Sequence, residues 1–133
     1  MNFRRHSNSF RESYIDTLGK LYEYSTRRYA KNRMSKVIDT EHEYTYEQFR
    51  RTCEMLSKRL TQFGIGASDK VAILAQNMPE WTVAFFSTVP FGRIAIPILP
   101  ESSANEVTNI LNHSESKVLF VSKKLLPNVT QEC

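Results

Sequence analysis

Apolar and polar positions alternate along this chain with two different periods, and the clearest stretch is helical. In residues 47–63 the apolar side chains recur at steps of four and three, which places them on one face of an α-helix. They are Phe49, Cys53, Leu56, Leu60 and Phe63. Thr45 followed by Gln48 predicts a capping box, and Gly64 predicts a left-handed stop. The pattern therefore predicts a well-bounded helix with one buried face.

The region before this helix predicts another helix and two short strands. Apolar residues of 10–29 fall largely on one helical face, and Ser9 with Glu12 fits a second capping box. The apolar positions of this expected helix are Phe10, Tyr14, Leu18, Leu21 and Tyr29. Residues 34–40 and 44–46 are rich in strand-forming side chains, so we expect two strands that can pair as a hairpin.

Beyond residue 70 the pattern changes to continuous apolar runs separated by helical stretches. The runs at 71–75, 94–99 and 118–121 predict strands that are buried on both faces. Asn77 with Glu80 predicts a capped helix reaching toward Phe91, and Ser103 with Glu106 predicts another. Strand and helix in this order predict an α/β fold, a layered parallel-sheet unit with flanking helices and right-handed crossovers.

The last predicted strand has no obvious helix after it, since residues 123–133 are short and interrupted by Pro127. An uncovered edge strand exposes unpaired backbone groups and can pair with another chain. We therefore expect self-association through this edge. We take 1–133 as a single α/β subdomain that stops where such a domain would continue, with a basic helical lead-in over 1–35 and strand–helix repeats over 36–133.

Charge and cysteine content narrow the possible classes of protein. Of the formal charge of +4 on 133 residues, the first 36 residues carry nine basic and three acidic side chains, and the remainder nine and eleven. Among the possible functions, nucleic-acid binding is the least favoured, because the basic residues share their predicted helix with an apolar face. Cys53 and Cys133 are too far apart for a disulfide framework, which favours a reducing compartment.

Two further features favour a cytoplasmic protein with at most peripheral membrane contact. The basic start has no apolar stretch behind it, so it does not resemble a signal peptide. The longest apolar stretch, 81–99, contains Pro90, Gly92, Arg93 and Pro97, which favours a buried helix and strand over a membrane span.

No group of residues predicts a catalytic or metal site. The segment 64–66 has two glycines, but it follows a helix and precedes a strand, the wrong order for a dinucleotide loop. Cys53 lies on the apolar stripe, and Ser87 and Thr88 lie within a predicted helix without a nucleophile elbow. The histidines and the exposed acids show no spacing suited to a metal or an acid–base pair; they are His6, His42, His113, Glu41, Glu43 and Asp69. We expect no catalytic, cofactor-binding or metal-binding residue in this chain.

Three blocks in order resemble the opening of the AMP-forming acyl-CoA synthetases, which include the long-chain fatty acid CoA ligases. Residues 44–49 are similar to the Thr-Tyr-x-Glu-Leu type motif of that family. Residues 69–81 resemble its Asp-x-Val-Ala-Ile strand followed by Asn-x-Pro-Glu-Trp, and residues 91–100 with 117–122 resemble its next two strands. The resemblance runs over almost the whole chain, with Arg93 where the family usually has alanine.

The resemblance implies an ATP-dependent enzyme that activates a fatty acid as an acyl-adenylate and transfers it to coenzyme A, with Mg²⁺ at the phosphates. The working motifs of the family lie downstream, so the chain is expected to be an incomplete, inactive N-terminal piece of the large domain. Its partners would be the remainder of its own polypeptide and the fatty acid. For Arg93 we expect the head group to reach solvent; the alternative is that this end of the strand faces a neighbouring part of the full protein. The alternative function is a self-contained binding module that docks a partner on its sheet edge.

Overall fold

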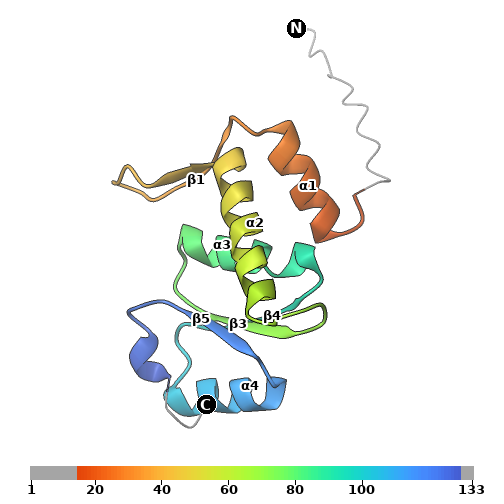
Figure 1. Ribbon diagram of the computed structural model, residues 1–133. Coiled ribbons are helices and arrows are strands. Elements are labelled where there is room, and N and C mark those ends of the chain that lie inside the picture. Colours follow the sequence, from red (N-terminus) through yellow and green to blue (C-terminus); the bar gives the residue numbers. More distant parts are fainter. Residues whose placement is uncertain (1–14, 130–133) are drawn as a thin grey trace, which may run out of the picture.

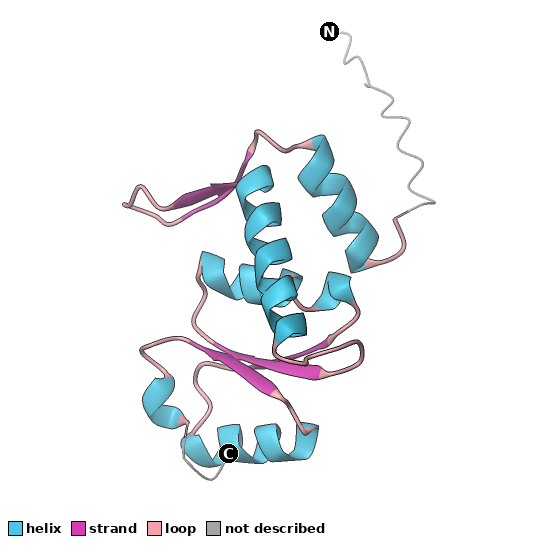
Figure 2. Ribbon diagram, viewed as in Figure 1, coloured by secondary structure: helices cyan, strands magenta, loops and turns pink. Residues whose placement is uncertain are grey.

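A computed structural model describes residues 15–129, and its central feature is a three-stranded parallel sheet between two helical layers (Figures 1 and 2). The helices are α1 (Leu18–Arg28), α2 (Tyr46–Gln62), α3 (Pro79–Phe86) and α4 (Ala104–Ser114). The strands are β1 (Arg33–Lys36), β2 (Glu43–Thr45), β3 (Lys70–Leu74), β4 (Ile94–Ile98) and β5 (Val118–Val121). Short 3₁₀ turns, η2 (Val89–Phe91) and η3 (Leu126–Asn128), follow α3 and β5.

The sheet has the order β4-β3-β5, and both pairings are parallel, as predicted. Ile73 in the central strand lies opposite Pro97 on one side and Phe120 on the other. Because β4 and β5 lie on opposite sides of β3, right-handed crossovers must place α3 and α4 on opposite faces. Figure 1 shows this arrangement, with α2 and α3 above the sheet and α4 below it. The layered α/β fold is confirmed.

Burial on both faces was expected for every strand of this sheet, and it holds for the central strand alone. Residues 71–74 of β3 are completely buried. β4 and β5 each have one neighbouring strand in the described part of the chain, so they form the edges of its sheet. Ile94 is 44% exposed and β5 is half-buried along its length. The apolar runs predicted the three strands correctly, but they did not predict which strand lies at the centre of the sheet.

Helix α1 is shorter than predicted and buries a different face. It begins at Leu18, where the Thr17 side chain accepts a hydrogen bond from the backbone N–H of Lys20. The expected cap at Ser9 and the positions Phe10 and Tyr14 lie outside the described residues. The helix buries Tyr22 and Thr26, whereas Leu18, Leu21 and Tyr29, predicted on the inner face, are 44%, 42% and 37% exposed. The prediction of the buried face was wrong, because one aromatic residue at position 22 fixes the rotation of the helix.

Tyr22 owes its burial to an aromatic cluster between α1, α2 and α3. Its ring stacks on Phe86 with centroids 5.9 Å apart and meets Phe49 edge to face at 6.1 Å. Such ring pairs stabilise by about 0.5–1.5 kcal/mol beyond their buried area. The cluster therefore outweighs the pull of the smaller apolar residues Leu18 and Leu21.

Helices α2 and α4 begin as predicted, each with a complete capping box. Thr45 and Gln48 cap α2, and Ser103 and Glu106 cap α4, with the hydrogen bonds made in both directions. Gly64 has φ of 79°, the left-handed conformation expected after α2. Phe63 was predicted on the buried stripe but is 76% exposed, because α2 ends at Gln62 and the chain turns away from the helical face.

Helix α3 differs from its prediction at both ends. Its N-cap is Met78, not Asn77, and no side chain caps it; Pro79 occupies the first turn. The helix ends at Phe86, short of Phe91, because Pro90 has no N–H and its ring would clash with the carbonyl of residue 86. Ser87 and Thr88 were expected inside the helix and instead lie in the break that follows it.

The predicted hairpin is present as the antiparallel pair β1 and β2. Its first strand ends at Lys36, so Val37 and Ile38, which suggested the strand, lie in the connection instead. Ile38 is 84% exposed there. The hairpin projects beside α2 and carries residues of 44–46 to the start of that helix (Figure 1).

Candidate functional site

A crevice lies at the carboxyl ends of the neighbouring strands β3 and β5. After β3 the chain passes to α3, on the face that α2 also covers. After β5 it turns to the opposite face, where Leu125 and Val129 join the apolar cluster between the sheet and α4. Neighbouring parallel strands whose connections leave to opposite faces form the usual ligand crevice of an α/β sheet. This position is therefore the candidate site.

A pocket of about 360 Å³ occupies this crevice on the face covered by α2 and α3. Its walls come from the ends of β3 and β5, from α2 and from α3. They include Leu56, Ile73, Trp81, Ala84, Phe120 and Val121. Such a pocket favours apolar or aromatic groups over phosphates. We name it the upper pocket.

Polar groups of the upper pocket are few. Glu80 also lines it, and its carboxylate lies 2.9 Å from Nε2 of His42, which joins α3 to the hairpin. The pKa of Tyr44, another lining residue, is raised by burial and secondarily by the charge of Glu80. The hydroxyl of Ser122 is buried and has no hydrogen-bond partner among the described residues. Trp81, the one tryptophan of the chain, stacks on Phe85 at 5.4 Å and can report on the pocket by fluorescence.

Cys53, which we set aside as a nucleophile, lies in the interior. It is fully buried beside Val83, whose carbonyl oxygen is 3.8 Å from the thiol sulfur. Burial, and to a lesser extent the nearby Glu54 charge, raise the pKa of the thiol to about 12. A thiol in such surroundings is protonated at neutral pH and packs as a small apolar side chain.

The hydroxyls of Ser87 and Thr88 are used within the fold. Both side chains are completely buried, and both donate to the carbonyl oxygen of Ala84, at 2.9 and 2.8 Å. These bonds satisfy the end of α3, where Pro90 interrupts the backbone pattern. Their surroundings are those of helix-terminating residues.

The remaining polar residues considered in the sequence do not converge. His42 pairs with Glu80, Glu43 with Arg33 at 2.9 Å, and His113 lies exposed on α4, while His6 is outside the described residues. Asp69 accepts from the Gly66 N–H and contacts Lys117, both at 2.7 Å; these contacts lower the pKa of its carboxyl, Lys117 more strongly. Over residues 15–129 no group of three His, Cys, Asp or Glu side chains is placed to hold a metal ion.

Arg93 lies in the interior, so the expectation that its head group reaches solvent was wrong. The residue is 5% exposed, and each guanidinium nitrogen donates a hydrogen bond to the end of α2 or to the turn that follows it. Nε donates to the Ile65 carbonyl at 3.0 Å, Nη1 to Ser57 Oγ at 2.8 Å and Nη2 to Thr61 Oγ1 at 2.7 Å. A helix carboxyl end carries partial negative charge, which compensates a buried cation. Arg93 thus ties β4 to α2.

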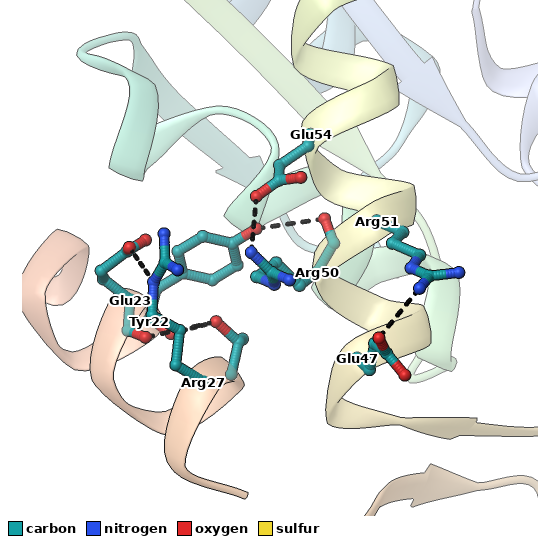
Figure 3. A network of polar contacts seen from close by, with 8 residues as sticks. Tyr22, Glu23, Arg27, Glu47, Arg50, Arg51 and Glu54 are labelled. Atoms are coloured by element: carbon teal, nitrogen blue, oxygen red, sulfur yellow. Dashed lines mark hydrogen bonds and ion pairs between the residues drawn. The ribbon is translucent and has the colours of Figure 1, made fainter. Parts of the chain in front are cut away.

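Tyr22 joins α1 to α2, and ion pairs within each helix lie around this contact and on the far side of α2 (Figure 3). The Tyr22 hydroxyl reaches across to donate to the Arg50 carbonyl at 3.3 Å, and Arg50 pairs with Glu54 at 3.4 Å. The other pairs drawn there, Glu23 with Arg27 and Glu47 with Arg51, also span one helical turn. Each arginine labelled in Figure 3 is therefore paired with a glutamate, as on a solvated helical face. Burial of the Tyr22 side chain raises the pKa of its hydroxyl.

Comparison with known proteins places this fold. A sequence model described as "AMP-binding enzyme" matches residues 24–133, most of the chain. The chain belongs to the AMP-binding enzyme family. The resemblance seen in the three blocks is confirmed, and Thr45, Pro79 and Trp81 lie in the family segment at a helix cap, at the start of a helix and in a pocket wall.

Several relatives of this AMP-binding family member are named as CoA ligases. The long-chain-fatty-acid–CoA ligase of Thermus thermophilus is 31% identical over 127 residues, which are 92% of this chain and 24% of that ligase. The 4-hydroxybutyrate–CoA ligase 2 of Metallosphaera sedula is 28% identical over 95 residues, 71% of this chain and 17% of that protein. The chain spans about a fifth of the length of the curated relatives it matches.

Solved structures of adenylate-forming ligases share the fold. The Mycobacterium tuberculosis fatty acyl CoA synthetase aligns with a TM-score of 0.77 at 27% identity, covering 83% of this chain and 22% of that one. The anthranilate CoA ligase AuaEII, solved with anthranoyl-AMP, aligns with a TM-score of 0.78 at 24% identity, over 84% of this chain and 21% of that one. The second likeness shows the fold alone.

The lengths and apolar character of the helices bear on whether one of them could cross a membrane. Within residues 15–129, no helix combines the length and apolar character that a membrane crossing requires. The stretch 81–99 forms α3, η2 and β4, as the sequence predicted in outline.

Sequence reasoning missed the upper pocket and the bonding of Arg93. The pocket depends on the strand order β4-β3-β5, which a single sequence does not state. The partners of Arg93 were signalled only by the hydroxyl residues Ser57 and Thr61, one helical turn apart on α2.

Proposed function

We propose that this chain forms part of an ATP-dependent, AMP-forming acyl-CoA ligase acting on fatty acids, in which it serves as scaffold. The observation that carries the proposal is the family match over residues 24–133, together with 31% identity over 127 residues to a protein named long-chain-fatty-acid–CoA ligase. The Mycobacterium tuberculosis fatty acyl CoA synthetase, with its TM-score of 0.77, supports the same activity.

The reaction has two balanced steps. A carboxylate oxygen of the fatty acid attacks the α-phosphorus of ATP and pyrophosphate leaves, which yields an acyl-adenylate. The thiolate of coenzyme A then attacks the acyl carbon, forming the thioester as AMP leaves. Mg²⁺ is the usual partner of the ATP phosphates in such reactions.

The upper pocket is unsuited to the phosphates of ATP, and over residues 15–129 no three His, Cys, Asp or Glu side chains are placed to hold a metal ion. The upper pocket has apolar walls, and its charged group is the carboxylate of Glu80, which repels phosphate. The glycines at 64 and 66 lie between the end of α2 and the start of β3, so they do not form a loop before a helix. We therefore assign nucleotide, metal and coenzyme A binding to polypeptide beyond this chain, and no step of the reaction to its own side chains.

The scaffold role predicts that residues 1–133 alone do not catalyse fatty-acid-dependent exchange of pyrophosphate into ATP. A longer polypeptide that contains this chain together with the rest of a ligase should catalyse it and form acyl-CoA. The measurement is incorporation of labelled pyrophosphate, with palmitate and octanoate compared and a no-acid blank.

The possible results separate the parts of the proposal. Exchange by residues 1–133 would refute the scaffold role, and inactivity of the longer polypeptide with every acid would refute the ligase function. A preference for octanoate would refute only the long-chain assignment.

We also propose a cytoplasmic location with at most peripheral membrane contact, on the grounds of the two widely spaced cysteines.

A further inference from the structure

The path of the chain after β5 bears on where the sheet continues in a longer polypeptide. From β4 the chain crosses β3 to reach β5, and its connection through α4 lies on one face of the sheet. After β5 it turns to that same face, where Leu125 and Val129 join the cluster between the sheet and α4 (Figure 1). Connections between parallel strands are nearly always right-handed, so two connections on one face advance in the same direction. A parallel strand that follows would therefore lie on the outer side of β5.

The outer edge of β4 is poorly suited to a further strand. The N–H of Ile94 donates to the carbonyl oxygen of Asp69 at 2.9 Å, on the side of β3. Because successive N–H groups of a strand point to opposite sides, the backbone nitrogen of residue 97 points away from β3. That residue is Pro97, which has no N–H to donate. Proline on the outer side is a feature of strands that end a sheet.

β5 has no feature of this kind. Its sequence is Val-Leu-Phe-Val, without a charged residue or a proline. The N–H of Lys117 donates to the carbonyl oxygen of Lys70 at 2.9 Å, on the side of β3, so the amides of Val118 and Phe120 point outward. No strand among residues 15–129 accepts from them. These two amides are therefore suited to pair with a following strand.

The side chains of β5 indicate which kind of strand fits beside it. Leu119 packs against the cluster between the sheet and α4, and Phe120 packs against the cluster between the sheet and α2. All four residues of β5 are half-buried. A neighbour that is apolar on both faces would bury them further, as in parallel sheets that helices cover on both sides. A strand with one polar face would not.

We infer that the polypeptide following residue 133 supplies a parallel strand, apolar on both faces, that pairs with the outer edge of β5. This inference rests on the proposed function, because it takes the chain as part of a longer ligase. The chain spans about a fifth of the length of its curated relatives, which leaves ample polypeptide for such a strand. Self-association of the isolated chain would use the same amides, so the following strand should prevent it.

Hydrogen exchange in two polypeptides tests the inference. Residues 1–133 are compared with a longer polypeptide that contains this chain together with the rest of a ligase, without ATP, acid or coenzyme A. Rates for residues 1–133 are extrapolated to high dilution, which removes any effect of self-association. The amides of Val118 and Phe120 should exchange at least about tenfold more slowly in the longer polypeptide. The outward amide of Ala95 in β4 is the matched control and should slow much less.

A pair of variants at position 118 separates strand pairing from other kinds of cover. Val118→Pro removes an outward N–H and leaves the bond from Lys117 to Lys70 in place, whereas Val118→Thr keeps the N–H and the β-branched shape. In the longer polypeptide, the proline variant should speed exchange at Phe120 at least several-fold, and the threonine variant should not. Circular dichroism checks that both variants fold.

Three results would overturn the inference. One is equal exchange at Val118 and Phe120 in the two polypeptides. Another is stronger protection at Ala95 than at Val118 and Phe120, since the sheet would then continue beyond β4. The third is equal exchange at Phe120 in the folded proline and threonine variants. If the longer polypeptide is inactive with every acid but its β5 amides are protected, the ligase function fails and the strand placement stands.

Discussion

At the scale of single residues, Arg93 shows how a charge can be placed inside a small domain without a carboxylate partner. Its three nitrogens donate to Ser57, Thr61 and Ile65 at the carboxyl end of α2. A guanidinium presents its donors in a fixed fork, which suits carbonyl and hydroxyl acceptors held at set positions. The sequence revealed an unusual arginine but not its acceptors, because these lie 28 to 36 residues away.

We predict that Arg93→Met lowers the free energy of unfolding by about 2–4 kcal/mol, since several buried acceptors lose their donors. Arg93→Lys should recover only part of this loss, because one ammonium cannot reach all three acceptors. Urea unfolding followed by Trp81 fluorescence measures the effect. The matched change Arg59→Met on the exposed side of α2 should cost about 0.5 kcal/mol or less. Equal effects at positions 59 and 93 would contradict the assigned bonding.

At the scale of helices and strands, local signals predicted what local interactions decide. The capping boxes of α2 and α4 were predicted correctly because each is made by residues three apart, Thr45 with Gln48 and Ser103 with Glu106. The start of α3 was misplaced by one residue: Met78 is the N-cap, and Pro79, which has no N–H to leave unsatisfied, follows it in the first turn. The buried face of α1 was misjudged because an aromatic cluster from three helices selects it. Long-range packing is therefore where sequence patterns failed.

The caps give a second prediction. Thr45→Ala and Ser103→Ala should each reduce the free energy of unfolding by about 1 kcal/mol, the usual cost of losing an N-cap side chain. Asn77→Ala removes the residue that the sequence suggested as a cap for α3, and it should change stability by less than about 0.5 kcal/mol. Chemical denaturation of the three variants under one condition decides this. A loss at Asn77 as large as that at Thr45 would show that Asn77 caps α3 after all.

At the scale of the whole molecule, the arrangement of layers follows from one central strand. β3 contributes Ala72 and Leu74 to the cluster between the sheet and α4, and Val71 to the cluster between the sheet and α2. The sequence predicted three parallel strands and helices on both faces, which alternation of elements alone implies. It did not predict which strand is central, and so it missed the upper pocket.

This arrangement predicts a ranking of hydrogen exchange. The amides of residues 71–74 should exchange most slowly, close to the rate set by global unfolding, because β3 is covered on both faces and both edges. Amides on the outer sides of β4 and β5 should exchange much faster, by at least about tenfold, since they face no neighbouring strand. Exchange measured residue by residue in the free chain tests this. Slowest exchange in β5 instead would mean that its outer edge is covered.

The grip of Arg93 on α2 has a consequence for how the family can vary. Ser57 and Thr61 face the guanidinium from successive turns, so they set the phase of α2 relative to the sheet. A relative with alanine at position 93 does not need hydroxyl side chains on α2. A relative with arginine at position 93 needs small hydrogen-bond acceptors at positions 57 and 61. We expect the residues at positions 57, 61 and 93 to change together among relatives. Their covariation would indicate whether the buried cation is kept or lost.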